Sequence, residues 1–438
     1  MNPEPHVIVL DELNPQDLAM LQALYSRSAE SVDVHIDKVK KSGSGKFMES
    51  FYVGYGHKSI ADCGSTTLFL EGVSILAAKA VQDWSLYSGQ ETSTRYIDMS
   101  KQPIIDPVGT EASAEVLKRW MDFYTSNQDA VAEHLTQMYP RKSDEDEKTY
   151  GKAIKARVFD IMRSFLPSGI TTQLSWHTNL RQAADKLAML RHHPVPEIRD
   201  LGLTMLQKLQ ERFPNSFSHK LYEEQEEYRA MVAKEYTYYN PATSPKDVVC
   251  TSTLNLRDLT PYLDVLMKRP VKTDVPHFLA ECGTLTFEFL LDFGSFRDLQ
   301  RHRNGVCRMP LVTTKFGFHS WYLNQLPLEV RQRALDLIAK QTIAIEELQT
   351  TPEQRQYYIA MGFQVPCKVT YGLPAAIYVI ELRSGKLVHP TLRAIAHGMH
   401  HALCNQLVPL HTDMQEDDWD VRRGLQDIVA KPQNSLFP

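Results

Sequence analysis

A basic tripeptide, Arg301-His302-Arg303, is the sharpest chemical feature of this 438-residue sequence. Two arginine forks around an imidazole suit a large anionic ligand, because guanidinium groups bind phosphate or carbonyl oxygens bidentately. If the tripeptide is helical, its side chains project about 100° apart and would reach three neighbouring groups of such a ligand. The alternative is a solvated basic helix end, which is common on protein surfaces.

A second candidate lies in the polar loop YSGQETSTRY, which contains Ser93, Arg95 and Tyr96. A hydroxyl two residues before an arginine on a turn offers a phosphomonoester one neutral donor and one charged fork. Taken alone, the segment fits a surface turn with a stray arginine better than a phosphate site.

Two short segments that lie half the chain apart resemble each other. Ala61-Asp62-Cys63-Gly64 and Ala280-Glu281-Cys282-Gly283 both place an acid before Cys-Gly. Each continues into a run rich in Thr, Leu and Phe that is typical of a buried strand. The similarity predicts a tandem repeat, with repeat 1 at residues 1–238 and repeat 2 at residues 239–438.

Helical patterns follow both copies. GVSILAAKAVQDW comes after the first, and GSFRDLQRHR after the second, where Arg303 would share a face with Phe296 and Leu299. Long helical middle sections are predicted at 111–139 and 329–348. Further helices are predicted near the end of each half, at 179–192 and 391–408, and YYNPATSPKDVV reads as the linker between the halves.

The order of these motifs resembles the flavin-dependent thymidylate synthase family. That family has a Gly-His segment, a Thr/Phe-rich strand, a helix ending in Arg-His-Arg, a Ser-x-Arg-Tyr loop, and then Leu-Pro, Trp, Asn-x-Arg and Leu-Arg. The first half contains most of this order: Gly56-His57 with Ser59 and Asp62, Ser93-Thr94-Arg95-Tyr96, Leu166-Pro167, Trp176, Asn179-Leu180-Arg181 and Leu190-Arg191. Its Arg-His-Arg is replaced by Asp83-Trp84-Ser85.

The second half shows the reverse pattern. Arg301-His302-Arg303 is intact and follows Glu281 at the family's spacing, and Leu382-Arg383 remains. Leu311-Val312-Thr313 stands where Ser-x-Arg should follow, and Gly372-Leu373-Pro374 stands in the Asn-x-Arg region. Each of the two main motifs therefore survives once, as expected if the two repeats share one composite site.

The resemblance implies an α+β fold of two tandem domains, helix-rich with short antiparallel sheets. The implied flavin-binding residues are Arg301, His302, Arg303 and Asn179, with Ser59, Asp62 and Glu281 nearby. The implied nucleotide-binding residues are Ser93, Arg95 and Arg181. Either Arg191 or Arg383 would lie against the pyrimidine carbonyl as the catalytic group and stabilise negative charge developing on the ring.

The implied activity is FAD-dependent reductive methylation at C5 of a pyrimidine nucleotide, with dUMP to dTMP as the default. Methylenetetrahydrofolate and NADPH are the implied co-substrates. Alternatives are another pyrimidine nucleotide, another one-carbon product, or a flavin- or nucleotide-binding homologue without turnover. A net charge of −5 disfavours an enzyme that acts on nucleic acid. Cys307 would be a nucleophile only if arginines lowered its pKa, and we favour a small, partly buried thiol.

Composition is that of an ordinary globular protein, without a secretory signal or a membrane-length apolar run. The six cysteines contain no CxxC pair and fit neither a disulfide framework nor a zinc site. His397 and His401 share a helical face but lack an acidic partner at ligand spacing, so no metal site is expected. We expect a cytoplasmic homodimer that forms a pseudo-tetramer of four family-like domains.

Overall fold

The computed structural model describes residues 8–404, 409–415 and 421, which form two compact units. Unit 1 contains the residues up to Glu71 together with Leu86–Glu91 and Gln173–Thr237. Unit 2 contains Gly72–Ser85, Thr92–Thr172 and the chain from Tyr238 onward. The middle of repeat 1 therefore folds together with repeat 2. One passage between the units, at 237/238, falls beside the sequence-based repeat boundary, and the repeat division itself stays a prediction.

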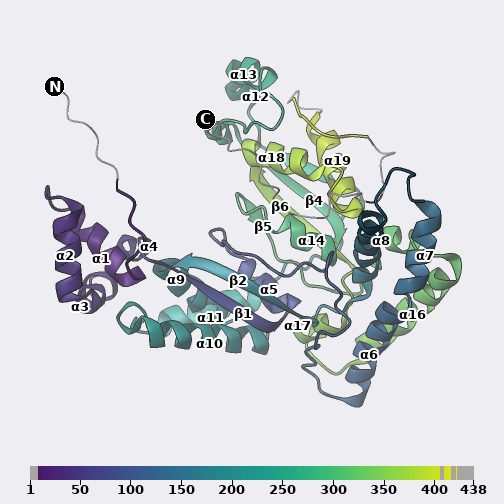
Figure 1. Cartoon of the computed structure of the whole chain (residues 1–438), viewed down its shortest axis with the longest axis horizontal. Coiled ribbons are helices and arrows are strands. Elements are labelled where there is room, and N and C mark those ends of the chain that lie inside the picture. The colour runs from purple at the N-terminus through teal and green to yellow at the C-terminus, as the bar shows by residue number, and fades with distance from the viewer. Residues whose placement is uncertain (1–7, 405–408, 416–420, 422–438) are drawn as a thin grey trace. The chain divides into compact units, whose positions relative to one another are not determined.

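Unit 1 is mainly helical (Figure 1). Its helices are α1 (Pro15–Tyr25), α2 (Val32–Ser42), α3 (Gly45–Phe47), the π-helix η1 (Met48–Gly54), α4 (Lys58–Asp62), α9 (Leu180–Leu190), α10 (Pro196–Arg212), the 3-10 turn η3 (Pro214–Ser216) and α11 (Glu223–Tyr236). Strands β1 (Ser65–Ser74) and β2 (Thr171–Asn179) pair with each other. The side chain of Asn179 caps α9 by accepting a hydrogen bond from the Gln182 N–H at 2.8 Å, which fixes where the strand ends and the helix begins.

Unit 2 combines a four-stranded sheet with helices from both halves of the chain. Its strands are β3 (Val249–Ser252), β4 (Thr284–Asp292), β5 (Val306–Cys307) and β6 (Gln364–Gly372). Its longer helices are α5 (Ile75–Gln82), α6 (Glu111–Ser126), α7 (Gln128–Met138), α8 (Glu147–Met162), α14 (Phe293–Leu299), α16 (Leu328–Glu347), α18 (Leu373–Arg383) and α19 (Pro390–Cys404). Its short helices are α12 (Leu256–Leu259), α13 (Leu263–Met267), α15 (Ser320–Asn324), α17 (Pro352–Arg355) and the 3-10 turns η2 (Arg163–Phe165), η4 (Thr260–Tyr262), η5 (His277–Cys282) and η6 (Gln356–Tyr358).

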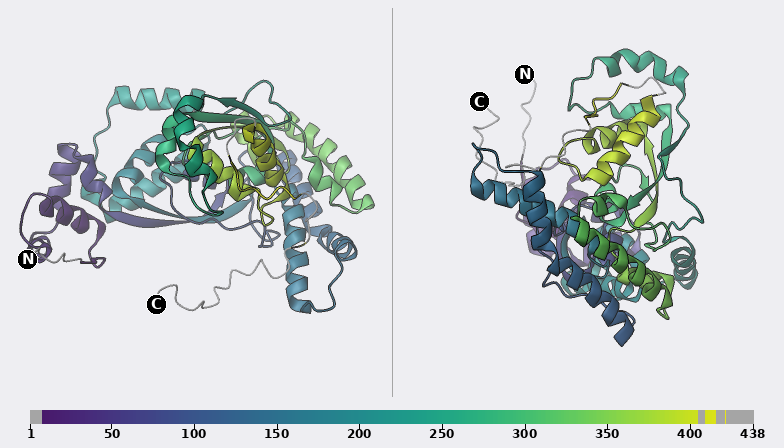
Figure 2. Two further views of the ribbon diagram at one scale, coloured as in Figure 1. Left: turned by 90° about the horizontal axis from the view of Figure 1, so that it is seen from above. Right: turned by 90° about the vertical axis from the view of Figure 1, so that its right-hand side faces the viewer.

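The sheet of unit 2 has the order β3-β4-β6-β5, and all its pairs are antiparallel. Phe287 of β4 lies opposite Val369 of β6 at its fully buried centre. Helices α18 and α19 pack on this sheet (Figure 1). Helix α6 from repeat 1 and α16 from repeat 2 pack side by side (Figure 2), joined by a hydrogen bond from the Gln341 amide to the Val116 carbonyl.

The two halves repeat the same succession of elements. Repeat 1 runs β1, α5, a long helical section, η2, β2 and α9, while repeat 2 runs β4, α14, α16, η6, β6 and α18. Even the helix caps correspond, since Ser74 caps α5 and Asp292 caps α14 through the third helical N–H. Helix α5 is buried on every side, as is most of α14, so these two helices form the centre of unit 2.

Backbone hydrogen bonds between the two halves come in reciprocal pairs about the turns that follow η2 and η6. The four bonds are Ser168 N to Ile359 O (2.9 Å), Met361 N to Leu166 O (2.9 Å), Gly169 N to Tyr357 O (2.9 Å) and Gly362 N to Ser164 O (2.7 Å). Each residue of one half has its counterpart 193 positions later in the other, as 168 has 361 and 166 has 359. The two halves thus meet within unit 2 as a local two-fold pseudo-dimer.

Most helices predicted from periodicity are confirmed. The section 111–139 forms α6 and α7, 329–348 forms α16, and 179–192 contains α9. The stretch 391–408 forms α19 up to Cys404, and its last four residues lie outside the described part of the chain. The linker YYNPATSPKDVV is irregular until β3 begins.

The prediction that the Arg-His-Arg tripeptide is helical is wrong. Helix α14 ends at Leu299, and the chain then turns to join the sheet as β5 beside β6. Gly305 makes this path possible, because a Cβ there would lie 2.5 Å from the Thr370 carbonyl oxygen. The three basic residues therefore stand on a turn between a buried helix and a strand.

Replacing Gly362 by alanine is expected to destabilise unit 2 by about 1–3 kcal/mol through overpacking. A Cβ at this position would lie 2.3 Å from the Phe318 ring and 2.8 Å from the Ser164 Cβ, at the pseudo-dimer contact. Gly151→Ala in α8 is the matched control, because its Cβ would meet nothing within 4 Å. Urea unfolding should show the loss for Gly362 alone. Equal stabilities of the two variants would contradict the tight reciprocal contact.

Candidate functional site

A cavity of about 680 Å³ lies in unit 2 beside the Arg-His-Arg turn. Its lining includes four arginines, Arg269, Arg301, Arg303 and Arg383, and two carboxylates, Asp274 and Glu381. The volume lies within the range of roughly 300–1,000 Å³ that small-molecule and cofactor sites occupy. The excess of cations over carboxylates favours an anionic ligand.

One wall of the cavity is held by a linked pair from two elements of repeat 2. Arg383, at the end of α18, donates from Nε to Nε2 of His302 at 2.7 Å and from Nη2 to the Asp298 carbonyl oxygen at 2.8 Å. Because Nε2 of His302 accepts, its remaining ring N–H lies on Nδ1. Arg383 is thus fixed against the Arg-His-Arg turn, while its role at a pyrimidine carbonyl stays a prediction.

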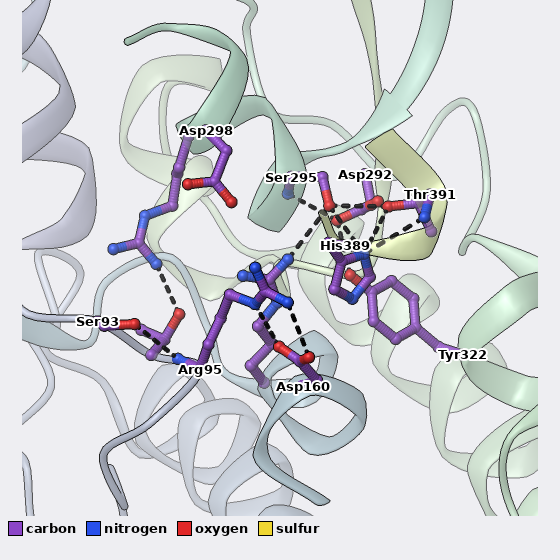
Figure 3. Close-up of polar contacts among 12 residues, drawn as sticks. Ser93, Arg95, Asp160, Asp292, Ser295, Asp298, Tyr322, His389 and Thr391 are labelled. Atoms are coloured by element: carbon purple, nitrogen blue, oxygen red, sulfur yellow. Dashed lines mark hydrogen bonds and ion pairs between the residues drawn. The ribbon is translucent and has the colours of Figure 1, made fainter. Parts of the chain in front are cut away.

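The Ser-x-Arg loop of repeat 1 does not line this cavity but lies beside α14, the helix that leads into the Arg-His-Arg turn (Figure 3). Arg297 of α14 donates to Oγ1 of Thr94 at 2.9 Å, across 203 residues of sequence. Arg95 forms a bidentate ion pair with Asp160 of α8, with Nε to Oδ1 at 2.5 Å and Nη2 to Oδ2 at 2.9 Å. The backbone N–H of Arg95 also donates to the Ser93 hydroxyl at 3.3 Å. The two surviving motifs therefore lie together within one unit of one chain.

Asp298 stands among the arginines of both motifs. Its carboxylate lies 3.4 Å from the Arg301 guanidinium. Burial alone would raise the pKa of Asp298, but the charges of Arg301, Arg95, Arg163 and Arg383 outweigh burial and hold the pKa well below its usual value. Asp298 is therefore an ionised internal counter-ion of the arginine cluster.

A buried polar network lies behind the site (Figure 3). Asp292 accepts from the Tyr322 hydroxyl at 2.8 Å and caps α14. The Ser295 hydroxyl contacts Nδ1 of His389 at 3.2 Å and accepts from Arg163 of repeat 1 at 3.2 Å. This network joins η2 of repeat 1 to α14 of repeat 2, the helix that leads into the Arg-His-Arg turn.

His302 is neutral in the folded protein. Burial, reinforced by the positive charge of Arg383, lowers the pKa of its imidazole to about 3. A histidine whose pKa is depressed by folding stabilises the fold fully above its unfolded pKa of about 6.5 and progressively less as the pH falls towards the folded value.

Acidification from pH 7.5 to 5.5 is therefore expected to cost about 1.4 kcal/mol through His302, since pH 5.5 is one unit below the unfolded pKa. His302→Gln should lose less stability over this interval than the wild type, as measured by urea unfolding at both pH values. His401→Gln, at an exposed histidine of α19, is the control and should follow the wild type. Identical pH dependence of all three proteins would contradict a neutral, buried His302.

Five of the candidate residues lie in unit 1. Arg181 pairs with Asp62 at 2.7 Å, and Asn179 uses its side-chain oxygen as the cap of α9. Ser59 is exposed on α4. Arg191 forms a bidentate ion pair with Glu226 of α11. Its Nε and Nη2 atoms donate to the two carboxylate oxygens at 2.7 and 2.5 Å.

Glu226 also binds His192 and Arg229. Burial opposes ionisation of Glu226, but its hydrogen bonds, led by those from Arg191 and His192, lower its pKa to about 2. Arg191 is thus part of a structural ion-pair cluster that ties α9 to α11.

Three further residues named from the sequence, Glu281, Cys307 and His397, are not among those that line the cavity. The side chain of Glu281 is exposed in η5. Cys307 is partly buried, and burial together with the charge of Asp83 raises its pKa, the opposite of what a nucleophilic thiolate requires. His397 contacts the Asp413 carbonyl oxygen at 2.9 Å, as a packed helix residue does.

Sequence reasoning missed Asp160, Arg163, Arg297 and Asp298. Asp298 left a signal, since a carboxylate three residues before Arg301 on a helical pattern lies within reach of it. The other three left none, because their partners lie far away in the sequence.

Comparison with known proteins agrees with the motif order. Residues 9–215 match the family model described as thymidylate synthase complementing protein. A flavin-dependent thymidylate synthase of Mycolicibacterium vanbaalenii is 25% identical over 167 residues, which cover 38% of this chain and 66% of that protein. The first half of the chain is therefore similar to flavin-dependent thymidylate synthases.

Longer relatives cover both halves. A UPF0159 protein of Chlamydia pneumoniae is 26% identical over 84% of this chain and 80% of its own length. A UPF0159 protein of Thermoplasma acidophilum is 22% identical over 88% of this chain and 92% of its own length. Among solved structures, Thymidylate Synthase X from Helicobacter pylori with FAD and dUMP is 17% identical, covering 47% of this chain and 96% of that one with a TM-score of 0.28.

Within the described part of the chain, none of the helices has the length and apolar character needed to cross a membrane. The α+β, helix-rich fold with short antiparallel sheets predicted from the sequence is confirmed.

Proposed function

We propose that this chain carries out FAD-dependent reductive methylation of a pyrimidine nucleotide, dUMP to dTMP by default, at the composite site in unit 2. The observation that carries the proposal is that the Ser-x-Arg loop of repeat 1 lies beside α14 of repeat 2, the helix that leads into the Arg-His-Arg turn. Arg297 of α14 donates to Thr94 of the loop, and Arg95 and Arg301 both act on the Asp298 carboxylate. The match of residues 9–215 to the family model described as thymidylate synthase complementing protein supports the class of reaction.

The residues of the cavity fit a flavin. Arg301 and Arg303 offer forks for phosphate or ring carbonyl oxygens, and neutral His302 offers its Nδ1–H. Tyr371 also lines the cavity, and its buried hydroxyl has no hydrogen-bond partner within the described residues. A buried orphan hydroxyl is costly unless a ligand satisfies it, so its position supports a polar ligand in the cavity. The reduced flavin, when bound, supplies the hydride.

The protein groups position and polarise. Ser93 and Arg95 would hold the nucleotide phosphate, since the turn that joins them presents a hydroxyl and a fork together. Arg383 would donate to a pyrimidine carbonyl and stabilise the negative charge that develops there, because it is preorganised by His302 and the Asp298 carbonyl. The raised pKa of Cys307 supports a reaction without a cysteine nucleophile.

The site that the pseudo-two-fold would generate from the other copy of each motif lacks the arginines of both motifs. Asp83 stands where Arg301 stands in the other copy, and the Leu311 and Val312 side chains are buried where the Ser-x-Arg loop would open. The N–H of Val312 donates to the Gln356 side chain at 3.0 Å. These features support one functional site per chain.

The direct test is product formation from dUMP by purified protein supplied with FAD, methylenetetrahydrofolate and NADPH, followed by chromatography of the nucleotides. Formation of dTMP supports the proposal. Tight binding of FAD and dUMP without any product would favour the non-catalytic homologue, and product from another pyrimidine nucleotide alone would change the substrate. The roles of Asn179, Arg181, Ser59 and Asp62, the homodimer and the cytoplasmic location stay predictions of the resemblance.

A further inference from the structure

Arg95, the arginine of the Ser-x-Arg loop, is held by a carboxylate that belongs to none of the motifs. Asp160 of α8 is 3% exposed and grips both Nε and Nη2 of Arg95. The Arg95 side chain is 13% exposed. We propose that Asp160 is a positioning residue that sets the direction in which Arg95 meets the nucleotide phosphate. This inference rests on the proposed function above.

The pair leaves a defined edge of the guanidinium for a ligand. Of the five N–H donors of an arginine, two are taken by Asp160. Because a bidentate pair fixes the guanidinium plane, it also fixes the directions of the three remaining N–H groups, which lie on Nη1 and Nη2. Binding a phosphate there needs no further ordering of a long, flexible side chain, which would otherwise weaken the affinity.

Asp160 also keeps Arg95 from a competing partner. The charges of Arg95 and Arg301 both help to hold Asp298 ionised, so Arg95 lies within the electrostatic reach of that carboxylate. Without Asp160, Arg95 would turn towards Asp298, and an incoming phosphate would then have to displace a carboxylate. The other two loop contacts engage the Thr94 hydroxyl and the Arg95 backbone N–H, so neither of them fixes the Arg95 guanidinium.

In the second repeat, the positions that correspond to Asp160 and Arg95 do not form such a pair. By the reciprocal bonds around η2 and η6, Glu353 is the counterpart of Asp160, and Gln356 that of Arg163. The counterpart of Arg95 is Thr313, so no guanidinium stands at the end of that loop. Among the described residues, the pair of a carboxylate with this loop arginine therefore occurs in repeat 1, which also keeps the Ser-x-Arg loop, and not at the corresponding positions of repeat 2.

The test compares Asp160→Asn with Glu353→Gln in the full chain, with FAD added. Calorimetry would measure the affinity for dUMP and for deoxyuridine, which lacks the phosphate. We expect Asp160→Asn to weaken dUMP binding by about tenfold or more, with deoxyuridine binding unchanged. Asp160→Glu, which keeps the charge, should restore part of the loss, and Glu353→Gln should behave as the wild type.

A double-mutant cycle separates positioning from general damage to the fold. In an Arg95→Ala background, Asp160→Asn should cost no further dUMP affinity, because there is no guanidinium left to position. Unchanged dUMP binding by Asp160→Asn would overturn the inference, because Asp160 would then have no effect on the nucleotide. Tighter binding would also overturn it, because Asp160 would then compete with the phosphate for Arg95. A wild-type protein that binds no dUMP would instead defeat the proposed function.

Discussion

Replacing Arg303 by alanine is expected to weaken FAD binding by about ten- to a hundredfold, the worth of a hydrogen-bonded charged group. Arg303 lines the cavity with Arg301 and Arg383, while His302 between them is neutral. The positive charge that faces an anionic ligand therefore resides in the arginines, and loss of one fork removes both charge and directed donors. Titration of FAD, followed by quenching of flavin fluorescence, measures the change.

The internal repeat provides a matched control for this experiment. Ser85 occupies in repeat 1 the position that Arg303 occupies in repeat 2, and its side chain is exposed. Ser85→Ala should bind FAD as the wild type does. Equal losses in the two variants would mean that flavin affinity does not depend on the Arg-His-Arg turn.

Arg383→Ala is expected to lower turnover by about a hundred- to a thousandfold, comparable with the loss of one donor from a preorganised anion site. Arg383 is held by His302 and the Asp298 carbonyl, so it needs no rearrangement as negative charge develops on the pyrimidine. Burial lowers the pKa of Arg383 from its usual value without neutralising it at pH 7. Chromatographic assay of dTMP formation under saturating substrates measures the effect on kcat.

Arg191→Ala is the discriminating comparison, because the sequence alone left Arg191 and Arg383 as alternatives. Since Arg191 is engaged by Glu226, its loss should cost unit 1 on the order of 1 kcal/mol of stability and leave the turnover of the folded protein largely intact. Loss of turnover in Arg191→Ala with normal turnover in Arg383→Ala would reverse the assignment.

The sequence predicted the motif residues because their types and order are visible without a structure. The long helices at 111–139 and 329–348 were predictable for the same reason, since an apolar stripe of period 3.6 directly reflects burial of one face. The complementary survival of the Ser-x-Arg and Arg-His-Arg motifs also indicated that the two halves share a site.

The partners of those motifs were beyond prediction. Asp160 lies 65 residues from Arg95, in an amphipathic helix with several other charges, and nothing in the pattern selects it. The reciprocal contact of the halves uses backbone N–H and C=O groups around Gly169 and Gly362, which every residue except proline carries. The end of α14 depends on a close approach of Gly305 to β6, a tertiary contact.

The most direct test of the composite site is the amount of flavin bound per chain. Purified protein would be saturated with FAD and freed of excess, and the released flavin would be measured from its visible absorbance against the protein concentration. One FAD per chain is predicted, because the Arg-His-Arg turn is present once and its counterpart reads Asp83-Trp84-Ser85. Two FAD per chain, or none after saturation, would contradict a single composite site formed by the two repeats.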